Sequence, residues 1–295
     1  MKLKMKNNKK AIIAFFASSL FLTACNSDDS SSIIEENTFG DAELYFDNGV
    51  NGDKLILGNS YKNSNGETLT INRFNYIISN VILIKADGTE YVYPKAKSYF
   101  VVSEEADLNT ISLENIPAGD YVKVKFGLGV DNQRYLEGET AQQEFWNYAA
   151  EHNLTWTWST GYRFINFEGT FTPATAGKHE DHEDPGHEEP GTGMPGLYNF
   201  QIHQGSNTAT DNYREITLNL PTTARVRKGD KPSIHVVTDA NKIADGTNKI
   251  ILKNNLNAAG TNASIMGGEN LIKIAENTLQ MFIVDHVHNG GATHH

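Results

Sequence analysis

The sequence predicts a mainly β fold, an antiparallel β-sandwich with one or two short helices. Many short segments alternate apolar and polar residues or are rich in β-branched and aromatic residues, and turn residues separate them. Short strands in this number are typical of sandwiches and barrels. One segment, 173–196, departs from the pattern because it is rich in Pro, Gly, His and acidic residues.

The clearest strand candidate is 121–130, where apolar residues at every second position alternate with lysines and glycines. This period of two predicts a strand with one buried face. The apolar segment 74–84 is followed by Asp87-Gly88 and then by 90–94, which predicts a hairpin. Further strands are expected at 43–47, 99–103, 162–171, 197–203, 214–220 and 233–239.

One helix is expected at about 140–152, and a second at about 269–279, where the pattern is mixed. Thr140 and Gln143 have the spacing of a capping box, in which two side chains cap the first turn of a helix. An apolar stripe from Ala141 to Ala149 supports the first helix.

The N-terminus predicts export with a lipid anchor. Five lysines precede an apolar run of 12 residues, 11–22, which is too short to span a bilayer and fits a signal peptide. The run ends in Leu-Thr-Ala-Cys25, which resembles the lipobox of bacterial lipoproteins and implies acylation of Cys25. We therefore expect an outer-membrane lipoprotein, on the periplasmic face or the cell surface.

The chain divides into three expected parts: the signal peptide 1–24, a flexible tether 25–38, and a single domain 39–295. The segment 173–196 is expected to be a mobile loop inserted in this domain, because the strands on either side belong to one sheet system. Without the five signal lysines, 20 basic residues face 36 acidic ones. This acidic balance argues against a nucleic-acid partner and favours cationic ligands.

Histidines are the first candidates for chemistry. His286 and His288 are two residues apart, so both imidazoles would project from the same face of a strand, as a two-point metal site requires. Asp285 or a backbone carbonyl could orient one of the rings. His203 ends an apolar strand before a Gly-Ser turn, where sites are often built. His235 interrupts an apolar run, and we interpret it as structural.

Two further features compete with these histidines. The loop carries His179, His182 and His187 among acidic residues, which predicts weak and unselective binding of divalent metals. Trp156 and Trp158 would face the same side of a strand. Such a pair is a core feature, a stacking platform for a sugar, or a site that a strong oxidant modifies. Because no catalytic sequence motif is present, we predict a binding protein and not an enzyme.

Four segments resemble the MbnP-like family of bacterial copper-binding exported proteins: 72–83, WTWSTGYRFINFEG at 156–169, FQIHQGS at 200–206 and VDHVH at 284–288. The resemblance covers roughly 40–290. Some branches of that family carry four cysteines, whereas this chain has one. The His- and acid-rich loop is also absent from the family pattern.

The resemblance implies a β-rich domain for copper acquisition, storage or handoff, in which a diheme c-type peroxidase partner oxidises a tryptophan to kynurenine. Trp156 or Trp158 would be the modified residue. His203, His286 and His288 would be the ligands of copper as Cu(I). The alternatives are a carbohydrate- or polymer-binding lipoprotein that stacks its ligand on Trp156 and Trp158, and a structural envelope lipoprotein.

Overall fold

The computed structural model describes residues 34–35, 37–156, 161–174, 196–207 and 209–290. The predicted signal peptide and Cys25, the second tryptophan Trp158, and nearly all of the loop 173–196 with its three histidines lie outside these residues. None of the helices in the described part is long and apolar enough to cross a membrane.

In the part of the chain that the structure describes, the larger of two sheets has nine strands and is built around β4 (Thr68–Lys85), a long strand of 18 residues. It is rich in β-branched residues, which favour extended structure, and both of its faces are covered at 74–79, where six consecutive residues are buried. The other strands are, in their order across the sheet, β11 (Arg214–Val226), β8 (Gly119–Leu128), then β4, β9 (Ile165–Thr172), β10 (Tyr198–Gln204) and β13 (Asn262–Ile265), while β3 (Ser60–Lys62), β5 (Glu90–Val92) and β6 (Tyr99–Ser103) pair with β4.

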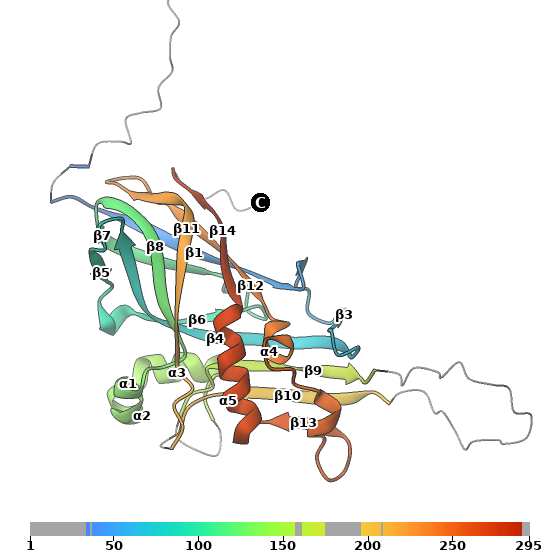
Figure 1. The fold of residues 1–295 in the computed structure, drawn as a ribbon. Helices are drawn as coiled ribbons and strands as arrows, with labels where there is room; N and C mark the ends of the chain where they lie inside the picture. The colour runs from blue at the N-terminus through green and yellow to red at the C-terminus, as the bar shows by residue number, and fades with distance from the viewer. Residues whose placement is uncertain (1–33, 36, 157–160, 175–195, 208, 291–295) are drawn as a thin grey trace, which may run out of the picture. The chain divides into compact units, whose positions relative to one another are not determined.

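The smaller sheet has five strands in the described residues and contains both ends of the domain (Figure 1). Its order is β14 (Phe282–His288), β12 (Ser233–Asp239), β1 (Phe39–Val50) and β2 (Asp53–Lys54), and β7 (Thr110–Pro117) pairs with β1. The mainly β, sandwich-like fold expected from the sequence is confirmed. The sheets are mixed, however, because β1 pairs with β12 and β10 with β13 in parallel.

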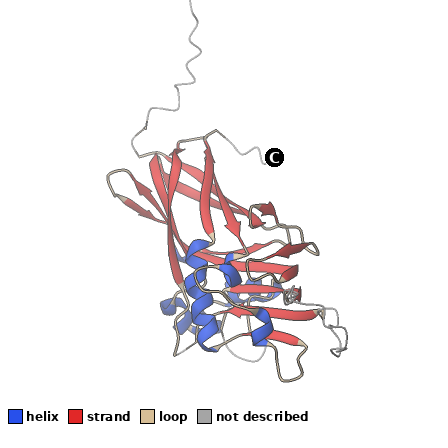
Figure 2. Cartoon of the chain, turned by 45° about the vertical axis from the view of Figure 1, so that its right-hand side comes forward, coloured by secondary structure: helices blue, strands red, loops and turns tan. Residues whose placement is uncertain are grey.

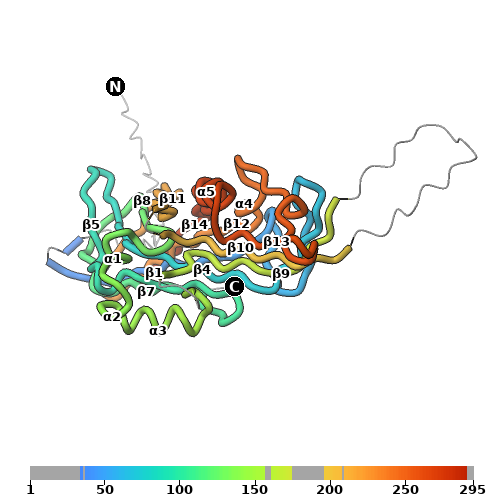
Figure 3. Tube along the Cα trace, turned by 90° about the horizontal axis from the view of Figure 1, so that it is seen from below, coloured from blue at the N-terminus to red at the C-terminus, as the bar shows by residue number. Residues whose placement is uncertain are grey.

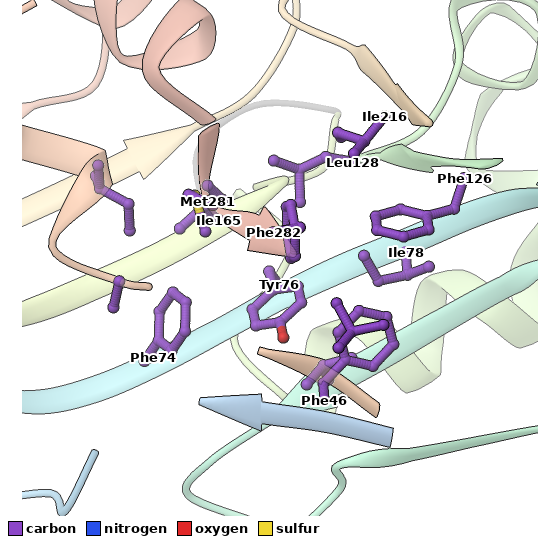
Figure 4. Close-up of a cluster of buried hydrophobic side chains, with 14 of the residues drawn as sticks. Phe46, Phe74, Tyr76, Ile78, Phe126, Leu128, Ile165, Ile216, Met281 and Phe282 are labelled. Carbon is purple, nitrogen blue, oxygen red and sulfur yellow. The ribbon is translucent and has the colours of Figure 1, made fainter. Parts of the chain in front are cut away.

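An aromatic core joins the two sheets (Figure 4). Phe46 of β1 and Phe282 of β14 meet Tyr76 of β4 and Phe126 of β8. The Phe126 and Phe282 rings are 5.3 Å apart and nearly perpendicular, an edge-to-face arrangement that favours aromatic pairs. All four side chains are at most 3% exposed, so apolar side chains fill this part of the space between the sheets.

Helices lie toward one end of the strands (Figure 2) and on both sides of them (Figure 3). The expected helix 269–279 is observed as α5 (Gly268–Asn277). The described residues also form α1 (Asn132–Leu136), α2 (Gly138–Ala141), α3 (Gln143–Glu151), α4 (Lys242–Asp245) and the 3-10 turns η2 (Lys95–Lys97), η3 (Leu252–Asn255) and η4 (Thr278–Gln280).

The expected helix 140–152 is divided, and its predicted capping box is wrong. Thr140 lies inside α2, and α3 begins at Gln143 without a side-chain cap. Gln142 lies at the break, where its side-chain amide donates to the carbonyls of Arg134 and Gly138 and accepts from the Tyr162 hydroxyl. These hydrogen bonds satisfy the buried amide and connect the helices to Tyr162. The candidate site lies in the segment that contains Tyr162.

Candidate functional site at Trp156 and His203

The tryptophan stretch has two parts. Tyr162, Phe164 and Phe167 are at most 1% exposed, so the second half is core, as the sequence suggests. The first half precedes β9: Thr155 bridges Tyr162, and the Trp156 amide donates to the Gly161 carbonyl over 3.1 Å. The backbone of Trp156 is therefore tied to Gly161 beside the sheet. Trp158 falls outside the described residues.

Two glycines lie close to the Trp156 ring, where a larger residue would contact it. Gly161 has a φ of +137°, which favours glycine, and a Cβ there would lie 3.3 Å from the Trp156 ring. A Cβ on Gly205 would lie 2.4 Å from the Tyr162 carbonyl oxygen and 3.4 Å from the Trp156 ring. The glycines of the WTWSTG and FQIHQG segments thus let backbone and indole approach each other closely.

His203 lies near the end of β10 and faces this ring, with the two ring centroids 5.9 Å apart. Its register partner on β9 is Asn166, so strand alternation puts His203 and Glu168 on the same face. The His203 Nε2 and Glu168 Oε1 atoms are 2.6 Å apart. His203 is 2% exposed, and its Nδ1 atom has no hydrogen-bond partner among the described residues.

The electrostatics keep this histidine neutral. Burial lowers the pKa of His203 below its ordinary value of 6.5, although the hydrogen bond to Glu168 acts in the opposite direction. Burial would raise the pKa of Glu168, but the hydrogen bond from His203 and the charges of Arg73 and Arg163 lower it overall. A neutral imidazole that donates its Nε2 proton to a carboxylate leaves a lone pair on Nδ1.

Two arginines frame the site. Arg73 forms ion pairs with Glu168 and Glu105, both at 2.8 Å. The Arg163 guanidinium lies over the Trp156 ring, 5.1 Å from its centroid. These cations balance the carboxylates, so the neighbourhood of Trp156 is not a general attractor of positive ions.

The remaining predicted ligands lie elsewhere. His286 and His288 are on β14 of the five-stranded sheet, whereas His203 is on β10 of the nine-stranded sheet. Both imidazoles lie on the same side of β14, as their spacing predicts, and they gather with His235 of β12. That group does not include His203. His235, which we interpreted as structural, is thus part of a cluster of three imidazoles.

The comparisons with known proteins agree with the resemblance. The family model described as MbnP matches residues 39–266, which is more than half of the chain. This chain belongs to the MbnP family. The matched region includes Trp156, Glu168, His203 and Gly205, and it ends before His286 and His288. The membership supports a copper-related role in broad terms.

One solved structure also resembles this protein, the MbnP from Methylosinus trichosporium. It has 11% sequence identity and a TM-score of 0.40, and the alignment covers 87% of this chain and 100% of that chain. A search of curated proteins found no match.

The residues at Trp156 suit a copper ion. Imidazole is a good ligand of copper, and the lone pair on the buried His203 Nδ1 has no other use among the described residues. Glu168 holds the opposite ring nitrogen, the arrangement by which proteins orient metal-binding histidines. Strand alternation is the signal that could have located Glu168, because it places Asn166, Glu168 and His203 on one face of the sheet.

Proposed function

We propose that this chain is an exported, lipid-anchored copper-binding protein that acts in copper acquisition, storage or handoff and does not catalyse a reaction. The observation that carries the proposal is the buried His203 Nδ1, which has no hydrogen-bond partner among the described residues and lies beside Trp156. Membership of the MbnP family supports a copper-related role in broad terms. The lipid anchor is Cys25, and the protein faces the periplasm or the exterior from the outer membrane.

Trp156 is the tryptophan that we propose to be oxidised to kynurenine, by a diheme c-type peroxidase partner. An indole nitrogen is a poor metal ligand, whereas kynurenine supplies an aniline nitrogen and a ketone oxygen. The half-buried Trp156 ring lies 5.9 Å from that of His203, centroid to centroid, so the product would add its donors close to the His203 imidazole. His203 and the modified Trp156 would then hold copper as Cu(I).

The geometry favours this function over stacking of a sugar on Trp156. A platform needs an open aromatic face, and the Arg163 guanidinium covers one face of the Trp156 ring. Gly161 and Gly205 bring the backbone against other parts of the ring. The ring is therefore enclosed by protein groups on several sides, which suits a built site better than an exposed platform.

The test begins with the mass of the tryptic peptide that contains Trp156, taken from protein purified from its native host. Conversion to kynurenine adds about 4 Da, because a carbon is replaced by an oxygen. Fragment masses then assign the change to Trp156 or Trp158. An unmodified peptide from copper-replete cells would contradict the kynurenine part of the proposal.

Copper binding is measured separately, by competition of the matured protein with a Cu(I) chelator. His203→Ala is compared with His152→Ala, which removes a histidine at the end of α3 whose ring packs on Tyr148. We expect His203→Ala to weaken Cu(I) binding by more than about tenfold, while His152→Ala binds as the unchanged protein does. Equal affinities for the two variants would exclude His203 as a ligand.

A further inference from the structure

A second group of imidazoles lies on the outer face of the five-stranded sheet. His235 of β12 is the direct register partner of His286 on β14, and Ser233 is the partner of His288. On β12 the neighbours Ile234 and Val236 are fully buried in the core, so His235 points to the other face. The pairing of two antiparallel strands therefore places three imidazoles side by side.

An irregularity in β14 puts His286 and His288 on this face. Phe282 and Val284 pack toward the core, and a strict alternation would turn residues 286 and 288 inward as well. The register shifts by one residue between His235 and Val236, which leaves Asp285 without a partner on β12. This β-bulge changes the phase of the strand, so Val287 packs toward the core and both histidines turn outward.

The ligand atoms are close enough for one ion. One nitrogen of each histidine lies within 4.8 Å of the other two, and the Nε2 atoms of His286 and His288 are 3.0 Å apart. Nitrogen ligands of a tetrahedral metal lie about 3.3 Å from one another. Small ring rotations would convert the present arrangement into a coordination shell. The ring of His235 is stacked on that of His286, with centroids 4.1 Å apart, which limits how far either ring can turn.

A carboxylate orients this group as well. Asp285 Oδ2 and His286 Nδ1 are 2.7 Å apart, so the proton of that imidazole is held at Nδ1 and its Nε2 carries a lone pair. In the described structure His288 can donate its own Nε2 proton to that lone pair. A bound metal would replace this shared proton, and the His288 proton would move to Nδ1.

The three imidazoles form part of the wall of a cavity of about 600 Å³. Asp47, Asp53 and Asp239 line the same cavity, and Lys54 is its one basic lining residue among those described. Asp47 and Asp239 lie on the same outer sheet face as His235, while Asp53 comes from the β1–β2 hairpin. Their charge attracts a cation, and the space leaves room for a further ligand on the metal.

We propose that His235, His286 and His288 form a second metal centre, which binds one first-row transition ion of the kind that imidazole prefers, Cu²⁺ or Zn²⁺. Three protein ligands leave an open coordination position toward the cavity, where water or a small donor molecule binds. The centre does not depend on tryptophan oxidation, and two of its three ligands lie beyond the part of the chain that the family model matches.

The experiment uses the full chain produced in a host without a diheme peroxidase, so that Trp156 stays unmodified. Cu²⁺ is added in the presence of a chelator that outcompetes isolated surface histidines, and the retained copper is measured by metal analysis and by electron paramagnetic resonance. We expect one tightly held Cu²⁺ with three nitrogen ligands. Added azide should change the spectrum, because it enters the open position.

His235→Ala, His286→Ala and His288→Ala should each abolish the retention of copper, whereas His203→Ala and His152→Ala should leave it unchanged. Asp285→Asn keeps all three ligands and serves if a histidine variant fails to fold. It should weaken the affinity by about 10- to 100-fold. Copper retention that His203→Ala removes, or that every variant keeps, would overturn the proposal, and an azide-insensitive spectrum would overturn the open position.

Discussion

Both imidazole sites of this protein contain a histidine that is held by a carboxylate, and they lie on different sheets. In each, a carboxylate holds one ring nitrogen, over 2.6 Å between Glu168 and His203 and 2.7 Å between Asp285 and His286. The first site offers one imidazole that is 2% exposed, next to an indole. The second offers three imidazoles on an open cavity. Of the two sites, only the second therefore has enough metal donors from folding alone.

The two sites also differ in the charges that surround them. Arg73 and Arg163 stand beside the Trp156 site, where they oppose the entry of a free cation. Aspartates line the cavity of the three-histidine cluster. The Trp156 site would gain a donor only by chemistry after folding, whereas the three-histidine cluster is electrostatically prepared for a metal as soon as the strands pair. We therefore expect the two sites to fill independently.

The largest expected effect comes from combining His203→Ala with His286→Ala in the matured protein. Each single variant removes one centre, so the copper content under chelator competition should fall from two ions per chain to one, and in the double variant to none. The sites share no ligand, so the losses should be additive. Metal analysis against protein concentration measures this directly.

His152→Ala combined with either variant is the control, because it removes the same number of histidines. A single variant that empties both centres would show that His203 and His286 share one copper ion. The two-site comparison would then fail, although a copper-binding function would survive.

A smaller effect is expected from Gly205→Ala, which is specific for the first site. The added methyl group would lie 2.4 Å from the Tyr162 carbonyl oxygen and against the Trp156 ring, so backbone and indole must move. We expect a loss of about 1–3 kcal/mol in unfolding free energy, as for other overpacked sites, and a lower yield of kynurenine. Denaturant unfolding and peptide mass measure the two quantities.

Gly267→Ala adds the same methyl group where no atom lies within 4 Å, and its φ of −175° suits any residue. It should keep the kynurenine yield. Cu²⁺ retention at the three-histidine cluster should be unchanged in both variants. An unchanged kynurenine yield in Gly205→Ala would show that oxidation does not require the observed position of Trp156.

Much of the fold could be predicted because strand alternation is a local signal. The predicted strands 99–103 and 233–239 match β6 and β12 residue for residue, and the hairpin at Asp87-Gly88 is observed between β4 and β5. What the sequence did not predict depends on distant partners. The parallel pairing of β1 with β12 joins residues 190 positions apart, for example Leu44 and Ile234. The division of the helix region depends on the buried Gln142 amide.

The same difference between local signals and distant partners applies to the sites. The spacing of His286 and His288 predicts a shared face, and the structure shows it. The partner His235 could not be found this way, because it faces His286 only through the β12–β14 register. The outward direction of the pair also depends on the bulge at Asp285, which no local pattern marks. Likewise, the ligand set of His203, His286 and His288 that the resemblance implies spans two sheets, which no local pattern could show.

The smallest expected effect is on stability as the pH changes, and it depends on the buried His203. Its pKa in the folded protein is lowered from 6.5, so between the lowered value and 6.5 the unfolded chain binds more protons than the folded one. The stabilisation is complete above pH 6.5 and is lost as the pH falls toward the folded pKa. Glu168, whose pKa is lowered from 4.5, adds a second loss at more acidic pH.

His203→Gln separates the two losses, since the amide still donates to Glu168 but does not titrate. In metal-free protein, we expect the variant to keep its stability from pH 6.5 downward until the Glu168 range is reached, while the unchanged protein weakens earlier. His152→Gln is the matched control and should follow the unchanged protein. If His203→Gln weakens over the same pH range as the unchanged protein, the proton is taken up elsewhere. Burial would then not be what keeps His203 Nδ1 unprotonated and available to copper.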